Sequence, residues 1–226
     1  MPQPIFSCRM YMAIAGVLLM ATLNGRAQEE RQQHTCTFNV AGEFAFPEGQ
    51  DGKNFHNGWG IQAGGGFALR RLAEPGRGND YFVTANFMYD KFKATDTALN
   101  AALKANPTQL SGATSAHGNF SAVTLDPTVR RSLNRQFSLY GLGGFGWFRR
   151  GVSFNNTSSP PNLLLASSLV VGRLAADSGV FDIGGGANFG FRKNGGLMLF
   201  AEFRVYRGLA INGASTLIPL SLGARW

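Results

Sequence analysis

Charged side chains recur at positions flanked by apolar residues, in segments where polar and apolar residues alternate. Glu202 and Arg204, for example, alternate with Ala201, Phe203 and Val205. Alternate residues of a strand point to opposite faces, so these charges should gather on the face opposite the apolar one. A lone buried charge is costly, so we expect ion pairs between the two signs. The expected set is Glu43, Arg70, Asp90, Asp126, Arg130, Asp182, Arg192, Glu202, Arg204 and Arg225.

Gly141, Gly143 and Gly146 have the spacing of a dinucleotide-binding fingerprint. That fingerprint requires a helix after the last glycine, whereas residues 147–150 continue a strand pattern. We therefore expect these glycines to ease strand curvature or to make room for large side chains opposite them. The sequence predicts no nucleotide or other cofactor.

The histidines, His34, His56 and His117, lie near the N-terminus or in connecting segments, without a carboxylate or cysteine at metal-ligand spacing. His117 and Ser121 are close in sequence and could serve acyl hydrolysis, but no third residue completes a triad with them. We expect no metal site and no catalytic residue.

Eight segments that should position these residues alternate with period two, which is the pattern of a strand with two unlike faces. Each is close to the length that a tilted strand needs to cross a bilayer, and eight is an even number, as closure of an antiparallel barrel requires. The segments are 36–46, 58–70, 80–91, 120–130, 136–149, 179–192, 197–207 and 216–226.

The connections alternate between mostly long, polar loops and mostly short turns, among them the hairpin signal at 193–196. The long loops 92–119 and 150–178 would share one end, as in membrane barrels. We predict an all-β fold, an eight-stranded antiparallel up-and-down transmembrane β-barrel over 36–226. An interior of eight strands is only wide enough for side chains to fill it.

The rival architecture is a soluble eight-stranded barrel of the lipocalin type, in which the apolar face points inward. The polar face carries Gly, Asn, Thr and isolated charges rather than a dense coat of Lys and Glu. Aromatic residues also cluster near the strand ends, as in two interfacial girdles. One rim would hold Phe44, Phe46, Trp59, Tyr89 and Trp147, and the other Tyr81, Phe137, Phe191 and Trp226. Both features favour the membrane barrel.

The N-terminus has the features of a secretory signal peptide over 1–27: Arg9, an apolar run over 10–23, and small residues before a cut after Ala27. A short leader, 28–35, would follow. Loss of Cys8 with the signal leaves Cys36 without an internal partner. The formal net charge of +8 comes from scattered residues rather than a Lys/Arg run, so we expect no nucleic-acid partner.

The eight-strand pattern, the segment 201–206 and the closing residues 222–226 resemble the small outer-membrane β-barrel proteins, the OmpA/OmpX-like and opacity-protein-like barrels of the porin family. The resemblance covers about 36–226. It implies a bacterial outer-membrane location, contact with outer-membrane lipid and lipopolysaccharide, and insertion by the barrel assembly machinery. It also implies a C-terminal assembly signal at Leu222, Ala224 and Trp226.

The two long loops offer surface for interaction. In 92–119, Thr95 and Asp96 should cap a short helix over 97–105. In 150–178, the apolar run 163–171 needs a partner, either the first long loop, an extension of the barrel, or a ligand. The expected function is non-enzymatic: envelope structure and surface interaction through these loops, with an unknown surface ligand. The alternatives are a narrow channel for small or hydrophobic solutes and a lipid A-modifying enzyme.

Overall fold

The computed structural model describes residues 36–71, 79–105, 107, 110, 112–134, 136–156, 176–190, 196–209 and 215–226. The predicted signal peptide, the leader and the apolar run 163–171 lie outside the described residues, as do Arg192 and most of the turn at 193–196.

Eight antiparallel strands form one closed barrel in which each strand pairs with its neighbours in sequence and β1 pairs with β8. This confirms the predicted fold class. The strands are β1 Cys36–Glu48, β2 Gly58–Arg71, β3 Asn79–Lys93, β4 Ala113–Ser132, β5 Phe137–Asn156, β6 Ala176–Gly190, β7 Met198–Gly208 and β8 Thr216–Arg225.

The apolar face of each strand points outward, as the alternation predicted. Ile61 is 53% exposed on β2, Val123 55% on β4 and Leu222 72% on β8. The residues that alternate with them along each strand point into the interior and are mostly buried. An apolar exterior around a polar interior is the arrangement of a transmembrane barrel. It is the reverse of the lipocalin type of barrel.

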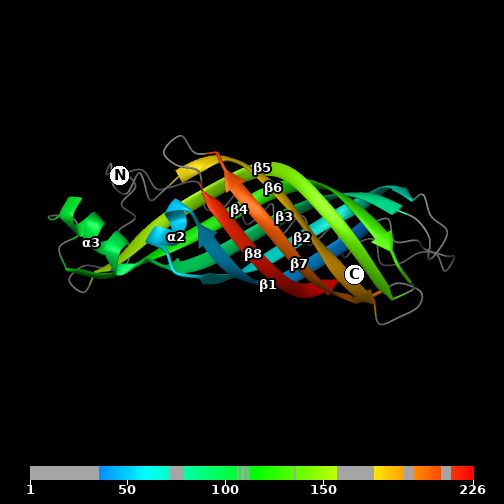
Figure 1. The fold of residues 1–226 in the computed structure, drawn as a ribbon, viewed down its shortest axis with the longest axis horizontal. Coiled ribbons are helices and arrows are strands. Elements are labelled where there is room, and N and C mark those ends of the chain that lie inside the picture. The colour runs from blue at the N-terminus through cyan, green and yellow to red at the C-terminus, as the bar shows by residue number, and fades with distance from the viewer. Residues whose placement is uncertain are drawn as a thin grey trace, which may run out of the picture. The chain divides into compact units, whose positions relative to one another are not determined.

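Two helices lie at the same end of the barrel, which we call the helix end (Figure 1). The opposite end, the turn end, holds the short β4–β5 turn and the residues Cys36 and Trp226. In that turn the side-chain oxygen of Asn134 accepts hydrogen bonds from the backbone N–H groups of Gln136, at 2.8 Å, and Phe137, at 2.7 Å. None of the helices in the described ranges is long and apolar enough to cross a membrane.

The helix α3, Asp96–Ala105, agrees with the prediction except that it begins one residue earlier. Thr95 caps it, since its hydroxyl oxygen accepts a hydrogen bond from the backbone N–H of Ala98 at 3.2 Å. The short helix α2, Gln50–Asn54, was not predicted. It begins after Gly49, whose φ of 64° lies in the left-handed region that favours glycine.

The strands β4 and β5 correct the prediction, because both continue well beyond 120–130 and 136–149 toward the helix end. Their pairing extends to Ala116 opposite Phe154 and Ala113 opposite Asn156. The interior face there is apolar except for Arg150, whereas the outward face becomes polar. The expected strands ended too early because the prediction required the outward residues of a strand to be apolar, and those of this part are polar. We call residues 113–120 of β4 and 149–156 of β5 the extension.

Candidate functional site

The guanidinium of Arg204 on β7 lies at the centre of the barrel interior and contacts carboxylates from three strands. Its Nη1 is 2.7 Å from Asp126 Oδ2 on β4 and 3.1 Å from Asp182 Oδ2 on β6. Its Nε donates to Glu202 Oε1 at 2.5 Å. Arg204 is 1% exposed, so its charge is balanced by these carboxylates rather than by solvent.

Glu202 continues the arrangement toward other strands. It accepts hydrogen bonds from Tyr140 Oη on β5 at 2.7 Å and from Gln62 Nε2 on β2 at 3.0 Å. Arg225 on β8 lies 3.7 Å from Glu202 Oε2, and its guanidinium stacks 4.6 Å from the centre of the Tyr140 ring. Together with Arg204, Asp126 and Asp182, these residues form what we call the lumen network.

The remaining predicted charges among the described residues form no ion pair with Arg204. Arg130 pairs at 2.8 Å with Asp80, a residue outside the expected set, and stacks on Phe82 nearer the turn end. Glu43 is buried and accepts a hydrogen bond from Ser221 at 2.8 Å. Asp90 is buried without a hydrogen-bond partner among the described residues. The side chain of Arg70 lies outside the described part of the structure.

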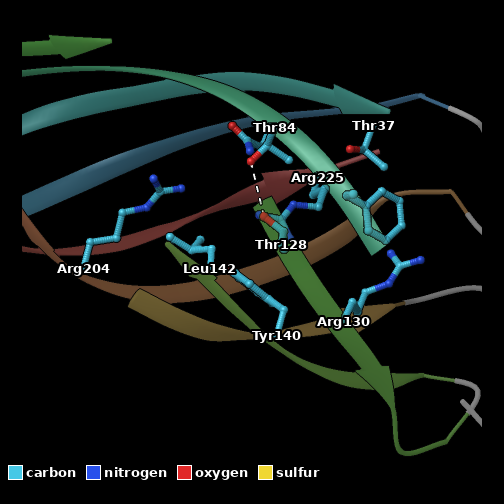
Figure 2. Close-up of a pocket in the computed structure, with 10 residues that line it drawn as sticks. Thr37, Thr84, Thr128, Arg130, Tyr140, Leu142, Arg204 and Arg225 are labelled. Carbon is cyan, nitrogen blue, oxygen red and sulfur yellow. Dashed lines mark hydrogen bonds between the residues drawn. The ribbon is translucent and has the colours of Figure 1, made fainter. Parts of the chain in front are cut away.

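Inward-facing glycines make room for the lumen network. A Cβ on Gly186 would lie 2.6 Å from Tyr140 Oη, and one on Gly144 would collide with Asp126. A cavity of about 20 Å³ lies beside the network. Figure 2 shows Thr84, Tyr140, Arg130 and Arg204 among the residues that line it. That volume holds about one water molecule.

An aromatic core fills the interior toward the helix end. Its centre is Phe120, which has no exposed surface and whose ring centre lies 4.7 Å from Phe92, 5.5 Å from Phe148 and 5.6 Å from Phe55. Phe55 directly follows α2, so this helical segment contributes a ring to the barrel interior. The barrel is therefore filled by charged groups in one part and by rings in the next.

A buried ion pair links α2 to the barrel. Arg150 on β5 contacts Asp51 of α2 and donates to Ser215 Oγ at 2.8 Å, and both charged side chains are buried. Burial raises the pKa of Asp51 above its ordinary 3.8, although Arg150 and Ser215 act to lower it. Asp51 and Arg150 both fall in segments that we expected to be loops. The inward alternation of Phe148, Arg150 and Val152 was the signal that could have revealed the site.

The other candidates for chemistry are not assembled into sites. Gly141, Gly143 and Gly146 lie within the single strand β5, which continues to Asn156, so no helix directly follows the last glycine. His117 and Ser121 are four residues apart on one strand, too far for a dyad at about 3.3 Å per residue. His117 instead lies opposite Ser153, whose hydroxyl donates to the backbone oxygen of His117 at 3.4 Å. The described residues contain no cluster of three or more potential metal ligands among His, Cys, Asp and Glu.

Leu222, Ala224 and Trp226 share the outward face of the last strand and its end. Trp226 and Phe38 exchange backbone hydrogen bonds of 2.8 and 3.0 Å, which extends the β1–β8 pairing to the last residue. Their role as an assembly signal stays a prediction.

Comparison with solved structures gives several barrels of the same fold. Neisserial surface protein A is 12% identical with a TM-score of 0.51, and the match covers 84% of this chain and 96% of that one. Ail of Yersinia pestis is 14% identical with a TM-score of 0.49, covering 84% and 97%. The N-terminal β-barrel domain of Pseudomonas aeruginosa OprF is 14% identical with a TM-score of 0.42, covering 86% and 100%. No protein-family model and no curated protein matches the sequence.

At these identities the likeness concerns the fold alone, and of the three barrels neisserial surface protein A has a TM-score above 0.5. The closed barrel of eight antiparallel strands, with its apolar exterior, is the fold of a small outer-membrane β-barrel protein. The expected resemblance is confirmed at that level.

Proposed function

We propose that this protein is a barrel of the bacterial outer membrane that is closed to diffusion and acts structurally and through the surface at its helix end. The observation that supports this is the filled interior: the lumen network and the aromatic core occupy successive levels, and the cavity between Tyr140 and Arg204 has room for about one water. A closed barrel can anchor a surface but cannot carry a flow of solutes.

The extension supports the second half of the proposal. Its outward residues are polar and exposed, among them His117, Asn119, Ser153 and Asn155, so this part is suited to water rather than to lipid. Both helices lie at the same end of the barrel (Figure 1). We infer that the helix end faces the cell exterior, and that its surface contacts outer-membrane lipid, lipopolysaccharide or an outside ligand.

A non-enzymatic role is part of this proposal. It is supported by the geometry around His117, where the neighbouring Ser153 hydroxyl donates to a backbone oxygen instead of an imidazole nitrogen. Mass analysis of lipid A from cells that express the protein would reveal acyl removal or addition. An altered lipid A would contradict this part of the proposal.

Planar-bilayer conductance is the test of closure. The protein would be purified from outer membranes in detergent and shown to be folded by a heat-dependent gel shift. We expect a folded protein without conductance. Sustained discrete steps would overturn closure and favour the narrow channel, with Arg204 and its carboxylates as the groups that determine selectivity.

Cysteine labelling on intact cells tests orientation. Cys36 is exposed and would first be changed to Ser. In that background, a membrane-impermeant maleimide should label Lys104→Cys on α3 and leave Gln136→Cys, in the turn between β4 and β5, unlabelled. Both positions are exposed, so they form a matched pair. The opposite labelling would invert the proposed topology.

A further inference from the structure

A groove of about 290 Å³ crosses the outward face of β3, β4 and β5 near the helix end. The residues that line it are Tyr89, Lys91, His117, Gly118, Asn119, Ser153 and Asn155. Neither the lumen network nor the aromatic core contributes to it.

The strand register explains why these side chains share a face. Lys91 lies opposite Asn119, which lies opposite Gly151; in the next row Lys93 lies opposite His117, which lies opposite Ser153. Directly opposite residues of antiparallel strands point to the same side. Gly151 places no side chain in this face, and a Cβ there would collide with the Asn119 amide.

The groove begins where the apolar band ends. Along β5, Trp147 is 55% exposed, and the next outward residue is Arg149. On β2, Trp59 is 66% exposed and lies directly opposite Lys91. Trp and Tyr mark the interface between hydrocarbon and headgroups in membrane barrels. The groove therefore lies at the level of the headgroups.

Positive charge dominates this region. Lys91 and Lys93 are exposed and have no ion pair among the described residues. Arg149 is the third cation, and its pair with Asp177, at 3.7 Å between two exposed side chains, is weak. The amides of Asn119 and Asn155 add uncharged donors. Of these donors, Lys91, Asn119 and Asn155 line the groove, and Lys93 and Arg149 flank it on the same outward face. Ammonium, guanidinium and amide donors gathered on one face are suited to a phosphate group.

We propose that this groove binds the phosphate groups of a phosphorylated glycolipid of the outer leaflet, of the lipid A class. The proposal rests on the proposed function for the orientation of the barrel. A membrane lipid fits better than a soluble anion because Val123 and Trp147, exposed just below the groove, would contact its acyl chains while the lysines contact its phosphates.

Native mass spectrometry of the detergent-solubilised protein, titrated with bisphosphorylated lipid A, tests the proposal. We expect Lys91→Gln with Lys93→Gln to weaken binding about ten-fold or more, which corresponds to about 1.4 kcal/mol, because each substitution removes a charged hydrogen-bond donor to phosphate. The matched control is Lys53→Gln with Lys104→Gln. It makes the same change in charge at exposed positions of α2 and α3 and should leave affinity unchanged.

Two probes separate the sources of phosphate. Dephosphorylated lipid A should bind at least ten-fold more weakly to the unchanged protein, and millimolar inorganic phosphate should not displace lipid A. Equal binding of both lipids, equal effects of both double variants, or displacement by inorganic phosphate would each overturn the proposal. A folded, heat-shifted barrel that fails these tests would leave the proposed function standing.

Discussion

The barrel interior is filled by charges around Arg204 and by rings around Phe120, and the two regions hold different parts of the chain together. The lumen network joins β2, β4, β5, β6, β7 and β8. The aromatic core joins β3, β4 and β5 to the segment after α2. The first therefore stabilises the closed barrel, and the second stabilises the base of the extension.

The two regions should also differ in how much stability a substitution removes. Among the described residues, Asp126 and Asp182 form ion pairs with Arg204 alone, whereas Glu202 also has Arg225 at 3.7 Å. The lipid outside the strands offers no water to a charge that loses its partner. A ring in the aromatic core has several apolar neighbours, so the loss of one ring leaves a cavity but no unpaired charge. We therefore expect the network to be the more sensitive of the two.

The largest effect is expected for Arg204→Met, which leaves Asp126, Asp182 and Glu202 without their shared cation. Removal of one partner from a buried ion pair typically costs about 3–5 kcal/mol. With three carboxylates affected, we expect a loss near the upper value, about 5 kcal/mol. The measurement is urea unfolding of the detergent-folded barrel, followed by tryptophan fluorescence.

Arg204→Lys is the matched control for that variant. It retains the charge but loses the planar donor group that reaches several carboxylates at once, so we expect an intermediate loss. If Arg204→Met were within about 1 kcal/mol of the unchanged protein, the network would be dispensable and the comparison with the aromatic core would fail.

Phe120→Ala should have the next largest effect, about 3 kcal/mol, at the lower end of the usual cost of deleting a buried ring. The lower value is expected because the segment after α2 can settle into the space left beside Phe55. The same unfolding measurement applies, with Phe120→Leu as the milder variant. A loss larger than that of Arg204→Met would reverse our ranking of the two regions.

Gly144→Ala tests, with a single added methyl group, how tightly the lumen network is packed. A Cβ at this inward position would collide with Asp126, and overpacking typically costs about 1–3 kcal/mol. Gly141 lies on the outward face of the same strand, where a Cβ would come no nearer than 4.0 Å to another residue. Gly141→Ala should therefore be close to neutral. Equal losses for the two alanines would point to strand curvature instead of room for the network.

Alternation along the chain was sufficient to predict the eight strands and the inward face of those charges whose side chains the structure describes. It could not predict which charges would meet, because contacts across the interior depend on the barrel register. Arg130 shows the difference: it was placed inside correctly, but its partner is Asp80, at the border of an expected loop. The position of Arg204 between three carboxylates likewise became visible only once the strands were paired.

The helix end was harder to predict from the sequence, for a physical reason. We expected strands to end where outward residues cease to be apolar, yet β4 and β5 continue because the aromatic core supports them from inside. The helix α2 was missed because its five residues are too few for a periodic signal, and no side chain caps its first turn. Its position depends on Phe55 and on the pair between Asp51 and Arg150, which lie far apart in the sequence.

The smallest effect is expected from the pH dependence of that pair. Because burial raises the pKa of Asp51 above 3.8, the folded state binds the Asp51 proton more tightly than the unfolded state does. Lowering the pH from above the raised pKa toward 3.8 should therefore increase the free energy of unfolding relative to Asp51→Asn, which cannot titrate. Unfolding both proteins across that window cancels the titration of all other groups. A difference that stays constant, or shrinks as the pH falls, would mean that the attraction of Arg150 outweighs burial at the base of the extension.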